Sequence, residues 1–495
     1  MSGSHGETSP LLENAIRSED SASAQGSPPA LHREPSTGPP RGIIDVATVL
    51  LIMSVSSFLS FAADTVILED IICRKYYRDQ GGFTKLPERS CKVAPVQSQV
   101  AIINGWRSVA ETLPALALAV PFGVLADSVG RKQVLVLALV GLFMNDLSVR
   151  IVYWFGDILP MQLVWLGAIG AGAITLQSLA FVMVAELCPP EQRVAAFSLI
   201  QSSQLLAQFI FVPVGGFLTS VNPWLPMAFS SANSVAAIPA AFALLPDTGK
   251  RQNATENSTM DPDSLDEPHE GREAHSQHTA DDDELSWLVK QMCALMACTR
   301  WVADNRKTVL VLACFFVFSF GTSSRDGSLF LQYASARLGW GLGQASVFVS
   351  LGAATNLVIH AIGVPALSTY LLERRRLTEM VKDKYLAQWS GLALMIGTLV
   401  ISQASSATVL AMGQIVASCG LAFTITARSL ITSMTSREHM ATLYTFIAVL
   451  DYAGMLTGGP SSAALFDAGE AWLGLPYLVS SLSFALALGS ITMAP

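Results

Sequence analysis

Twelve apolar stretches of membrane-spanning length constrain this chain more than any other feature. Each contains about 20 residues, the length that an α-helix needs to cross the hydrocarbon core of a bilayer. They lie roughly at 43–63, 101–122, 133–154, 162–185, 194–218, 225–246, 307–331, 343–366, 386–404, 407–430, 440–462 and 471–493. Because a spanning segment must satisfy its own backbone hydrogen bonds, these stretches predict an all-α membrane protein with 12 transmembrane helices.

Composition and the placement of charge support this prediction. Hydrophobic residues make up 51% of the 495 residues and charged residues only 14%, whereas a soluble protein of this size would expose far more charge. The charges gather in tails and loops, so the net charge of −8 indicates no partner. No basic face is available to neutralise phosphates, which excludes nucleic acid and leaves the lipid bilayer as the expected partner.

The chain is predicted to divide into four regions. Residues 1–42 are rich in Ser, Gly, Pro and Glu, so they are expected to form a disordered cytoplasmic tail. A six-helix bundle is expected at 43–246 and a second at 307–495. The acidic, polar region 247–306 between them is interpreted as a cytoplasmic linker that ends in an amphipathic helix on the membrane surface.

The distribution of Lys and Arg places both bundles with the N-terminus inside the cell. Even-numbered connections carry the basic residues Arg131, Lys132, Arg193, Arg374, Arg375, Arg376, Lys382, Lys384 and Arg437. The short outer connections are nearly free of them, as the positive-inside rule predicts. One connection disagrees, since 64–100 is expected outside yet contains Arg74, Lys75, Arg78, Lys85, Arg89 and Lys92.

The seven cysteines form no CxxC motif and no Cys/His array, so we expect no metal site and no cofactor. Cys73 and Cys91 differ from the others because both lie in the polar connection after the first apolar stretch. If that connection faces an oxidising compartment, the two are candidates for a disulfide bond.

The two bundles also repeat at a nearly constant spacing. Matching pairs are Arg131 with Arg376, Arg193 with Arg437, and Gly215-Gly216 with Gly458-Gly459, at offsets of 245, 244 and 243 residues. Each pair alone could be chance, but the agreement of three offsets favours two six-helix pseudo-repeats with parallel topology.

The connection between the second and third stretches contains the most specific motif. The segment Gly123-x-x-x-Asp127-x-x-Gly130-Arg131-Lys132 resembles the signature loop of major facilitator transporters in both sequence and position. Gly130 would allow a tight turn, and Asp127 and Arg131 would pair with the other half as a conformational latch. Ser128 replaces the basic residue usual in the family. The competing interpretation is a basic turn that only sets topology.

Other segments extend the resemblance over residues 43–493. Ala185-Glu186-x-x-Pro189-Pro190-Glu191-x-Arg193 resembles the family's loop between helices 4 and 5. The segments Gln332-Tyr333-Ala334-Ser335-x-Arg337-x-x-Trp340, Leu473-Gly474-Leu475-Pro476-Tyr477 and Asp70-Ile-Ile-Cys73-x-x-Tyr76-Tyr77 are similar to fungal members, the last also to proton-coupled folate transporters. The gating group that the resemblance implies is Gly123, Asp127, Gly130, Arg131, Lys132, Glu186, Arg193 and Arg437.

Two departures from the family bear on proton coupling. Helix 4 lacks the Arg that many proton-coupled members carry, and its corresponding region reads Leu163-Val164-Trp165-Leu166. Helix 5 reads Pro213-Val-Gly215-Gly216, which is one residue short of the antiporter pattern. Both weaken a direct transfer of proton antiport from the family.

Ionisable residues within the apolar stretches are the candidates for substrate binding or proton coupling, because each costs about 3 kcal/mol or more in a bilayer. Arg107 and Glu111 lie one turn apart near the middle of helix 2, and Asp146 and Arg150 repeat the arrangement in helix 3. These residues are expected either to bind protons or a polar substrate, or to form internal i,i+4 ion pairs that hold the bundle together. Asp451 in helix 11 has no evident partner on its own helix, which favours a protonatable group.

Neutral polar residues within the stretches are weaker candidates for the cavity wall. They are Gln177, Gln201, Gln204, Asn356 and His360. Each is also explained by a hydrogen bond between helices.

We therefore expect a monomeric secondary active transporter of a small organic solute, with proton-coupled efflux as the favoured activity. The alternatives are proton-coupled uptake of a nutrient or vitamin-like anion and a transporter-like membrane sensor. An enzyme is not expected, since no catalytic constellation stands out. The plasma membrane is the favoured location. Glu7-Thr-Ser-Pro-Leu11-Leu12 resembles an acidic dileucine sorting signal, which leaves the vacuolar membrane as the alternative.

Overall fold

The computed structural model describes residues 41–80, 91–167, 173–187, 193–245, 306–325, 327–433, 440–469 and 472–493. Helices account for nearly all of these residues, and no strand occurs among them. The predicted tail and linker lie outside the described residues, except that α2 already begins at Arg41 and α11 at Arg306.

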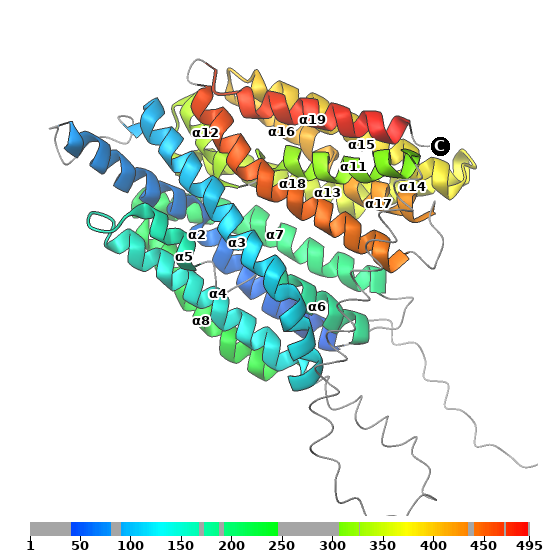
Figure 1. Ribbon diagram of the computed structural model, residues 1–495, viewed down its shortest axis with the longest axis horizontal. Coiled ribbons are helices and arrows are strands. Elements are labelled where there is room, and N and C mark those ends of the chain that lie inside the picture. Colours follow the sequence, from blue (N-terminus) through cyan, green and yellow to red (C-terminus); the bar gives the residue numbers. More distant parts are fainter. Residues whose placement is uncertain are drawn as a thin grey trace, which may run out of the picture. The chain divides into compact units, whose positions relative to one another are not determined.

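The first six predicted stretches correspond to a bundle of long helices (Figure 1). Their bounds are α2 (Arg41–Asp79), α3 (Ala94–Val129), α4 (Arg131–Trp154), the short η2 (Met161–Leu163) and α5 (Val164–Gly167), α6 (Ala173–Leu187), α7 (Arg193–Val221) and α8 (Trp224–Leu244). Apolar side chains buried between α2, α4, α6, α7 and α8 form the core of this half.

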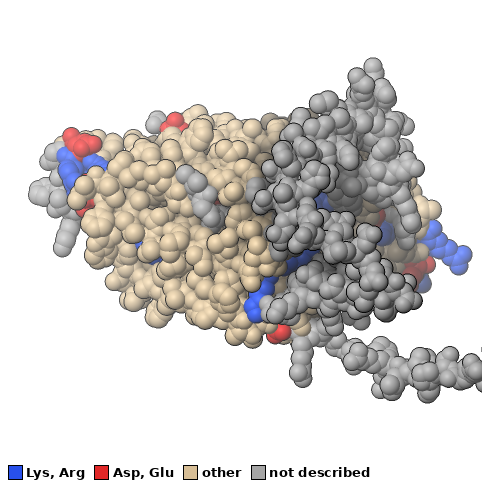
Figure 2. All heavy atoms as spheres, turned by 60° about the horizontal axis from the view of Figure 1, so that its bottom comes forward, with Lys and Arg blue, Asp and Glu red and all other residues tan. Residues whose placement is uncertain are grey.

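The last six stretches form the second bundle. Its elements are α11 (Arg306–Thr322), α12 (Ser328–Leu338), α13 (Leu342–Val358), η5 (Ile359–Gly363), α14 (Val364–Thr369), η6 (Tyr370–Arg374), α15 (Glu379–Ser402), α16 (Ala407–Cys419), α17 (Phe423–Ser433), α18 (Met440–Ala468) and α19 (Leu475–Thr492). Within the described residues, eight helical segments are long and apolar enough to cross a membrane. Figure 2 shows a broad uncharged surface, with the visible charged side chains mostly toward its two ends and its lower edge, as expected for a face that contacts lipid.

The predicted outer connection at 64–100 is largely wrong, because α2 continues to Asp79 and α3 begins at Ala94. Ion pairs explain why a basic segment stays helical there: Arg74 contacts Asp70 and Asp157, and Arg78 contacts Asp157 at 2.9 Å. Lys75 donates to the carbonyl oxygen of Leu159. Three of the six basic residues that disagree with the positive-inside rule, Arg74, Lys75 and Arg78, are therefore engaged near the end of α2, whereas Lys85 and Arg89 lie outside the described residues.

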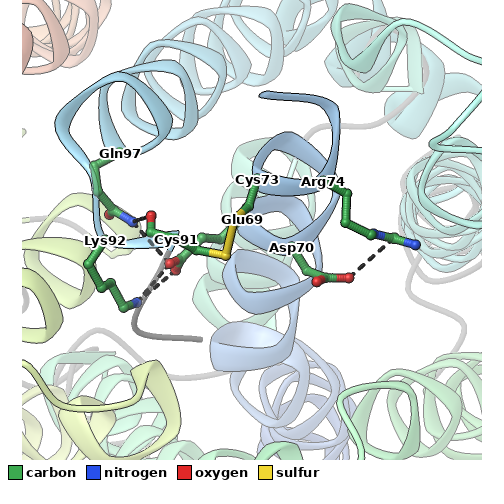
Figure 3. The surroundings of a disulfide bond; sticks show 7 residues. All are labelled: Glu69, Asp70, Cys73, Arg74, Cys91, Lys92 and Gln97. Atoms are coloured by element: carbon green, nitrogen blue, oxygen red, sulfur yellow. Dashed lines mark hydrogen bonds and ion pairs between the residues drawn. A yellow bond between two sulfur atoms is a disulfide. The ribbon is translucent and has the colours of Figure 1, made fainter. Parts of the chain in front are cut away.

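A disulfide bond joins Cys73 near the end of α2 to Cys91 just before α3, with the two Cα atoms 5.4 Å apart (Figure 3). Beside it, Lys92 forms an ion pair of 2.9 Å with the buried Glu69. Gln97 donates to the same carboxylate at 3.0 Å and to the Cys91 carbonyl oxygen at 3.1 Å. These contacts tie α2 to α3, and we call this side of the bundle the disulfide end.

The opposite side, which we call the signature end, carries the turn between α3 and α4. The predicted loop at 123–132 is mostly helical, since α3 runs to Val129 and α4 starts at Arg131. Gly130 alone makes the turn, with a φ of 110° that other residues rarely adopt. At the matching place in the second half, Arg376 has a φ of 52° and is the one non-glycine residue with positive φ in the described chain.

The seventh predicted stretch, at 307–331, was expected to be one continuous helix, which we call helix 7, but the structure shows a break within it. α11 ends at Thr322 and α12 begins at Ser328, with Gly327 at a φ of 61° between them. The hydroxyl groups of Ser324 and Ser480 share a hydrogen bond of 2.5 Å at the break. Such breaks are tolerated within membranes where neighbouring helices satisfy the freed polar groups.

Two residues of the segment Gln332–Trp340, together with Trp472 just before the segment Leu473–Tyr477, contact the end of α15 and the turn after it. The Tyr333 hydroxyl donates to the carbonyl oxygen of Ile401 and the Arg337 guanidinium to that of Ala404, at 2.5 and 2.7 Å. The Trp472 indole donates to the carbonyl oxygen of Ser402 at 3.2 Å. The last carbonyl groups of a helix have no partner within the helix, so Tyr333 and Trp472 cap α15, and Arg337 holds the turn that follows it. These contacts give Tyr333 and Arg337 a structural role.

The two halves meet through two helix pairs, α3 with α18 and α7 with α13. The backbones approach closely where glycine allows it: a Cβ atom on Gly216 would lie 2.5 Å from the carbonyl oxygen of Gly343. One on Gly105 would lie 3.1 Å from that of Gly459. These contacts lie toward the disulfide end, where Ser98 of α3 also donates to Asp467 of α18 at 2.5 Å. α3, α7, α13 and α18 correspond to the second, fifth, eighth and eleventh predicted stretches. The same two positions of each half therefore form the contacts, as the predicted pseudo-repeat requires.

Candidate substrate and coupling site

A cavity of about 610 Å³ lies among the helices of the N-terminal half and reaches Gly327 and Ser328 at the break of helix 7. Five ionisable residues line it: Asp64, Arg107, Glu111, Asp146 and Arg150. Four of them were predicted from the sequence, and the structure brings all four into one cavity. Apolar side chains such as Met53, Phe58, Phe61 and Leu142 share the lining. The cavity can therefore hold a solute with both polar and apolar parts.

Arg107 bridges two carboxylates in this cavity. Its Nη1 lies 2.5 Å from Asp64 Oδ2 on α2, and its Nε lies 2.9 Å from Glu111 Oε1 on its own helix. The side chains of Arg107 and Asp64 are mostly buried, whereas that of Glu111 is 43% exposed. Glu111 is thus the carboxylate of this group that is most accessible from the cavity.

Asp64 was missed because it directly follows the predicted first stretch. The signal that could have revealed it is the apolar pattern of Ile67, Leu68, Ile71 and Ile72, which continues the helix beyond it.

The second ion pair, Asp146 with Arg150, ties helices together. The Arg150 Nη2 also approaches the Met227 carbonyl oxygen and the Ser230 hydroxyl of α8, at 3.3 and 3.2 Å. Ser230 in turn donates to the carbonyl oxygen of Ser56 on α2 at 2.8 Å. The predicted internal ion pair is present, and its surroundings give it a structural role at the wall of the cavity.

Asp451 was expected to be protonatable because no partner was evident on its own helix, and the structure shows partners on two other helices. Arg428 of α17 lies 2.7 Å from Asp451 Oδ2, and the Ser319 hydroxyl of α11 donates to Oδ1 at 2.8 Å. Spacing along the chain could not reveal these partners, because Arg428 and Ser319 belong to other helices. Asp451 also lies outside the lining of the 610 Å³ cavity, so it does not belong to the same group as Glu111.

Asp451 and Glu111 nevertheless lie at similar depth on opposite halves. α3 and α18 run antiparallel and approach at Gly105 and Gly459. From this contact toward the signature end, Glu111 is six residues along α3 and Asp451 eight residues along α18. At 1.5 Å per residue these positions are about 9 and about 12 Å from the contact.

The neutral candidates separate into two groups. Gln177 and Gln204 line the cavity. Gln201 is exposed and lies outside the lining, as do Asn356 and His360. The His360 Nδ1 lies 3.0 Å from the main-chain carbonyl oxygen of Asn356, one turn earlier on the same helix.

The gating candidates are only partly described. Gly130 forms the predicted turn, and Arg131 and Lys132 begin α4 directly after it. Gly123 and Asp127 lie within α3, and Glu186 and Arg193 lie in α6 and at the start of α7. The side chains of Asp127, Glu186 and Arg193 and the whole of Arg437 lie outside what the structure describes.

Comparison with known proteins identifies the fold. The family model of the Major Facilitator Superfamily matches residues 46–458. This chain belongs to the major facilitator superfamily. It is therefore a multi-pass membrane transporter, and the prediction of 12 helices in two halves is confirmed. The family and its named relatives are transporters rather than enzymes.

Fungal transporters are among its relatives. The chain is 34% identical over 459 residues to the efflux pump ustT of Aspergillus flavus, which covers 90% of this chain and 86% of that one. It is 26% identical to the MFS efflux pump atnC of Emericella nidulans, over 95% of this chain and 94% of the relative. The predicted similarity to fungal members is confirmed.

Solved structures show the same fold at low sequence identity. The human organic anion transporter MFSD10 matches with a TM-score of 0.55 at 16% identity, over 92% of this chain and all of that one. The peptide transporter POT matches with a TM-score of 0.57 at 14% identity, over 93% of this chain and 95% of that one. At such identities the likeness extends to architecture and not to substrate.

Proposed function

We propose that this transporter exports a small organic solute by proton antiport, with Glu111 as the group that exchanges a proton. The observation that carries the proposal is the charge of the cavity. Three carboxylates, Asp64, Glu111 and Asp146, face two guanidinium groups, Arg107 and Arg150. One carboxylate is therefore in excess, and the exposure of Glu111 makes it the accessible one.

Protonation of Glu111 would change the pairing inside the cavity. While Glu111 is ionised, Arg107 is shared between it and Asp64. When Glu111 takes up a proton, Arg107 keeps Asp64 as its ionic partner and the excess charge of the cavity is cancelled. A proton and a cationic group of a solute then compete for the same carboxylate. Because only one of them can occupy the carboxylate at a time, the proton and the solute are carried across the membrane in opposite directions.

Movement of the two halves would supply the transport step. The tight contacts between the halves lie toward the disulfide end, at Gly105 with Gly459 and at Gly216 with Gly343. Rocking about these contacts would expose the site to the two sides in turn. The gating role of Gly123, Asp127, Gly130 and Arg131 remains part of this proposal.

The direction of transport follows from the relatives. Two of the fungal relatives are named efflux pumps, which favours export over uptake. The excess negative charge of the cavity also disfavours the alternative of anion uptake.

Purified protein in liposomes tests the proposal. A panel of radiolabelled solutes of similar size, comprising an organic amine, an organic acid and a neutral compound, is offered with and without a pH gradient. We expect at least one solute to accumulate only with the gradient and only with active protein. If no solute in the panel responds to the gradient, the proposed proton antiport is wrong.

We further propose that the protein acts as a monomer in the plasma membrane. The dileucine-like segment Glu7–Leu12 makes the vacuolar membrane the competing location. A fluorescently tagged chain and its Leu11→Ala/Leu12→Ala variant distinguish the two locations in fungal cells. Light scattering of the detergent-solubilised protein measures the oligomeric state.

A further inference from the structure

A second, smaller chamber adjoins the charged cavity and differs from it in chemistry. It has a volume of about 190 Å³ and lies where α3 meets α18 and the break of helix 7. None of the described residues that line it is ionisable, and its polar lining comprises Asn104, Ser108, Thr112, Ser323 and Ser328. Asn104, Ser108 and Ser328 line both the chamber and the charged cavity. The two spaces therefore meet at these three residues, and we treat them as the charged part and the neutral part of one site.

Asn104 is the notable donor at the junction. Its amide nitrogen is buried and has no hydrogen-bond partner among the described residues. A buried amide without a partner costs about 1–3 kcal/mol, so an acceptor is expected to satisfy it. The hydroxyl groups of Thr112 and Ser323 already donate to carbonyl oxygens of their own helices. Among the remaining donors of the chamber, Ser108 and Ser328 carry hydroxyl groups, and Asn104 is the one whose donor atom is buried without a partner among the described residues, so we take it as the group that selects an acceptor on a solute.

Helical geometry relates this donor to the charged part. Asn104, Arg107, Ser108 and Glu111 follow one face of α3 at helical spacing. Asn104 and Glu111 are seven residues apart, which corresponds to about 10 Å along the axis. A solute of moderate length can reach both.

From this arrangement we infer the substrate class: an organic amine that also carries a neutral hydrogen-bond acceptor, with Asn104 as the residue that selects the acceptor. This inference rests on the proposed function, whose site it shares. The protonated amine pairs with the excess carboxylate at Glu111. The acceptor, such as an amide or ester carbonyl, receives the Asn104 amide hydrogen. An apolar body packs on Met53, Phe58 and Phe61.

Four matched probes test the inference by calorimetric binding to full-length protein in nanodiscs, with empty nanodiscs as the blank. The probe with both groups is 6-amino-N-phenylhexanamide. N-phenylhexanamide lacks the amine, 7-phenylheptylamine lacks the amide, and adipic acid monoanilide replaces the amine by an acid. We expect the first probe to bind at least about tenfold more tightly than the acid, as one ionic contact predicts.

Two variants separate the two parts of the site. Asn104→Leu should weaken the binding of 6-amino-N-phenylhexanamide roughly five- to tenfold, which corresponds to the loss of one hydrogen bond. It should leave the binding of 7-phenylheptylamine unchanged. Glu111→Gln should weaken the binding of both amines and leave the binding of N-phenylhexanamide unchanged. Asn104→Ser retains a donor and should recover part of the loss, while Gln201→Leu, outside the lining, serves as the control.

Each result decides the matter. Preferred binding of the acid, binding of none of the four probes, or an equal effect of Asn104→Leu on both amines overturns the inference. Selective binding of the amine amide without gradient-driven flux refutes proton antiport and keeps the inference. Gradient-driven flux together with preferred binding of the acid keeps proton antiport and refutes the inference about the substrate class.

Discussion

Two ionic clusters lie at similar depth in the two halves of this transporter, and they differ in the ratio of acidic to basic groups. In the N-terminal half, Arg107 is shared between Asp64 and Glu111, and the surrounding cavity holds one excess carboxylate. In the C-terminal half, Arg428 and Asp451 form a one-to-one pair. A cluster with an excess carboxylate can take up a proton or a cation without leaving a buried charge uncompensated. In a one-to-one pair, neutralising either member leaves the other charge without a counterion. This difference is the reason why we propose that coupling takes place in the N-terminal half.

The largest expected effect comes from removing the central cation of each cluster. Arg107→Met leaves two carboxylates together in a mostly buried position, so we expect a loss of about 3–5 kcal/mol in the free energy of unfolding. Arg428→Met should cost less, because the Arg428 side chain is 47% exposed. Thermal unfolding of both purified variants in detergent measures the difference. A larger loss for Arg428→Met would break the comparison.

Neutralising the carboxylates should separate the clusters in function. Glu111→Gln is expected to reduce gradient-driven flux at least roughly 100-fold, as for the loss of a proton-transfer group. Asp451→Asn should reduce it less than roughly tenfold, because its effect is confined to a local ion pair. Flux in proteoliposomes, normalised to the amount of folded protein, gives both values. The reverse order would move the coupling site to the C-terminal half.

Reversing the C-terminal pair sharpens its structural role. Arg428→Asp and Asp451→Arg should each destabilise the protein, and the double variant should recover about 1–2 kcal/mol of the sum. A double-mutant cycle of unfolding free energies measures this coupling. Absence of any recovery would mean that the observed 2.7 Å contact contributes little to stability.

The smallest expected effect concerns the hydrogen bond to Asp451. Ser319→Ala removes the donor to Oδ1 and should cost about 1 kcal/mol of stability, with flux nearly unchanged. Thermal unfolding and flux of the same preparation test this, with Ser231→Ala as a control whose hydroxyl bonds only within its own helix. A strong loss of flux in Ser319→Ala alone would give the C-terminal cluster a functional role.

Much of the fold could be predicted because spanning helices leave a strong signal. Length and hydropathy located all twelve segments, and Gly130 marked the first signature turn through its conformational freedom. The break in helix 7 could not be predicted, since Ser323 to Gly327 are compatible with a continuous helix and the break depends on contacts such as Ser324 with Ser480.

The site was less predictable because pairing depends on neighbours in space. Arg107, Glu111, Asp146 and Arg150 could be found as charges within apolar stretches, and their i,i+4 spacing gave the local ion pairs. Asp64 and Arg428 lie close to the predicted ends of helices 1 and 10, where a charge looks like part of a loop. Because spacing along the chain did not connect Arg428 to Asp451, Asp451 was interpreted as a protonatable group without a partner on its own helix.

Proton release on solute binding tests the central claim most directly. For whichever panel solute is transported, calorimetry in two buffers of different ionisation enthalpy counts the protons released when it binds. The account predicts release of up to about one proton from the native protein and from Asp451→Asn, and none from Glu111→Gln. Unchanged release from Glu111→Gln, together with its loss in Asp451→Asn, would contradict the assignment of coupling to the N-terminal cluster.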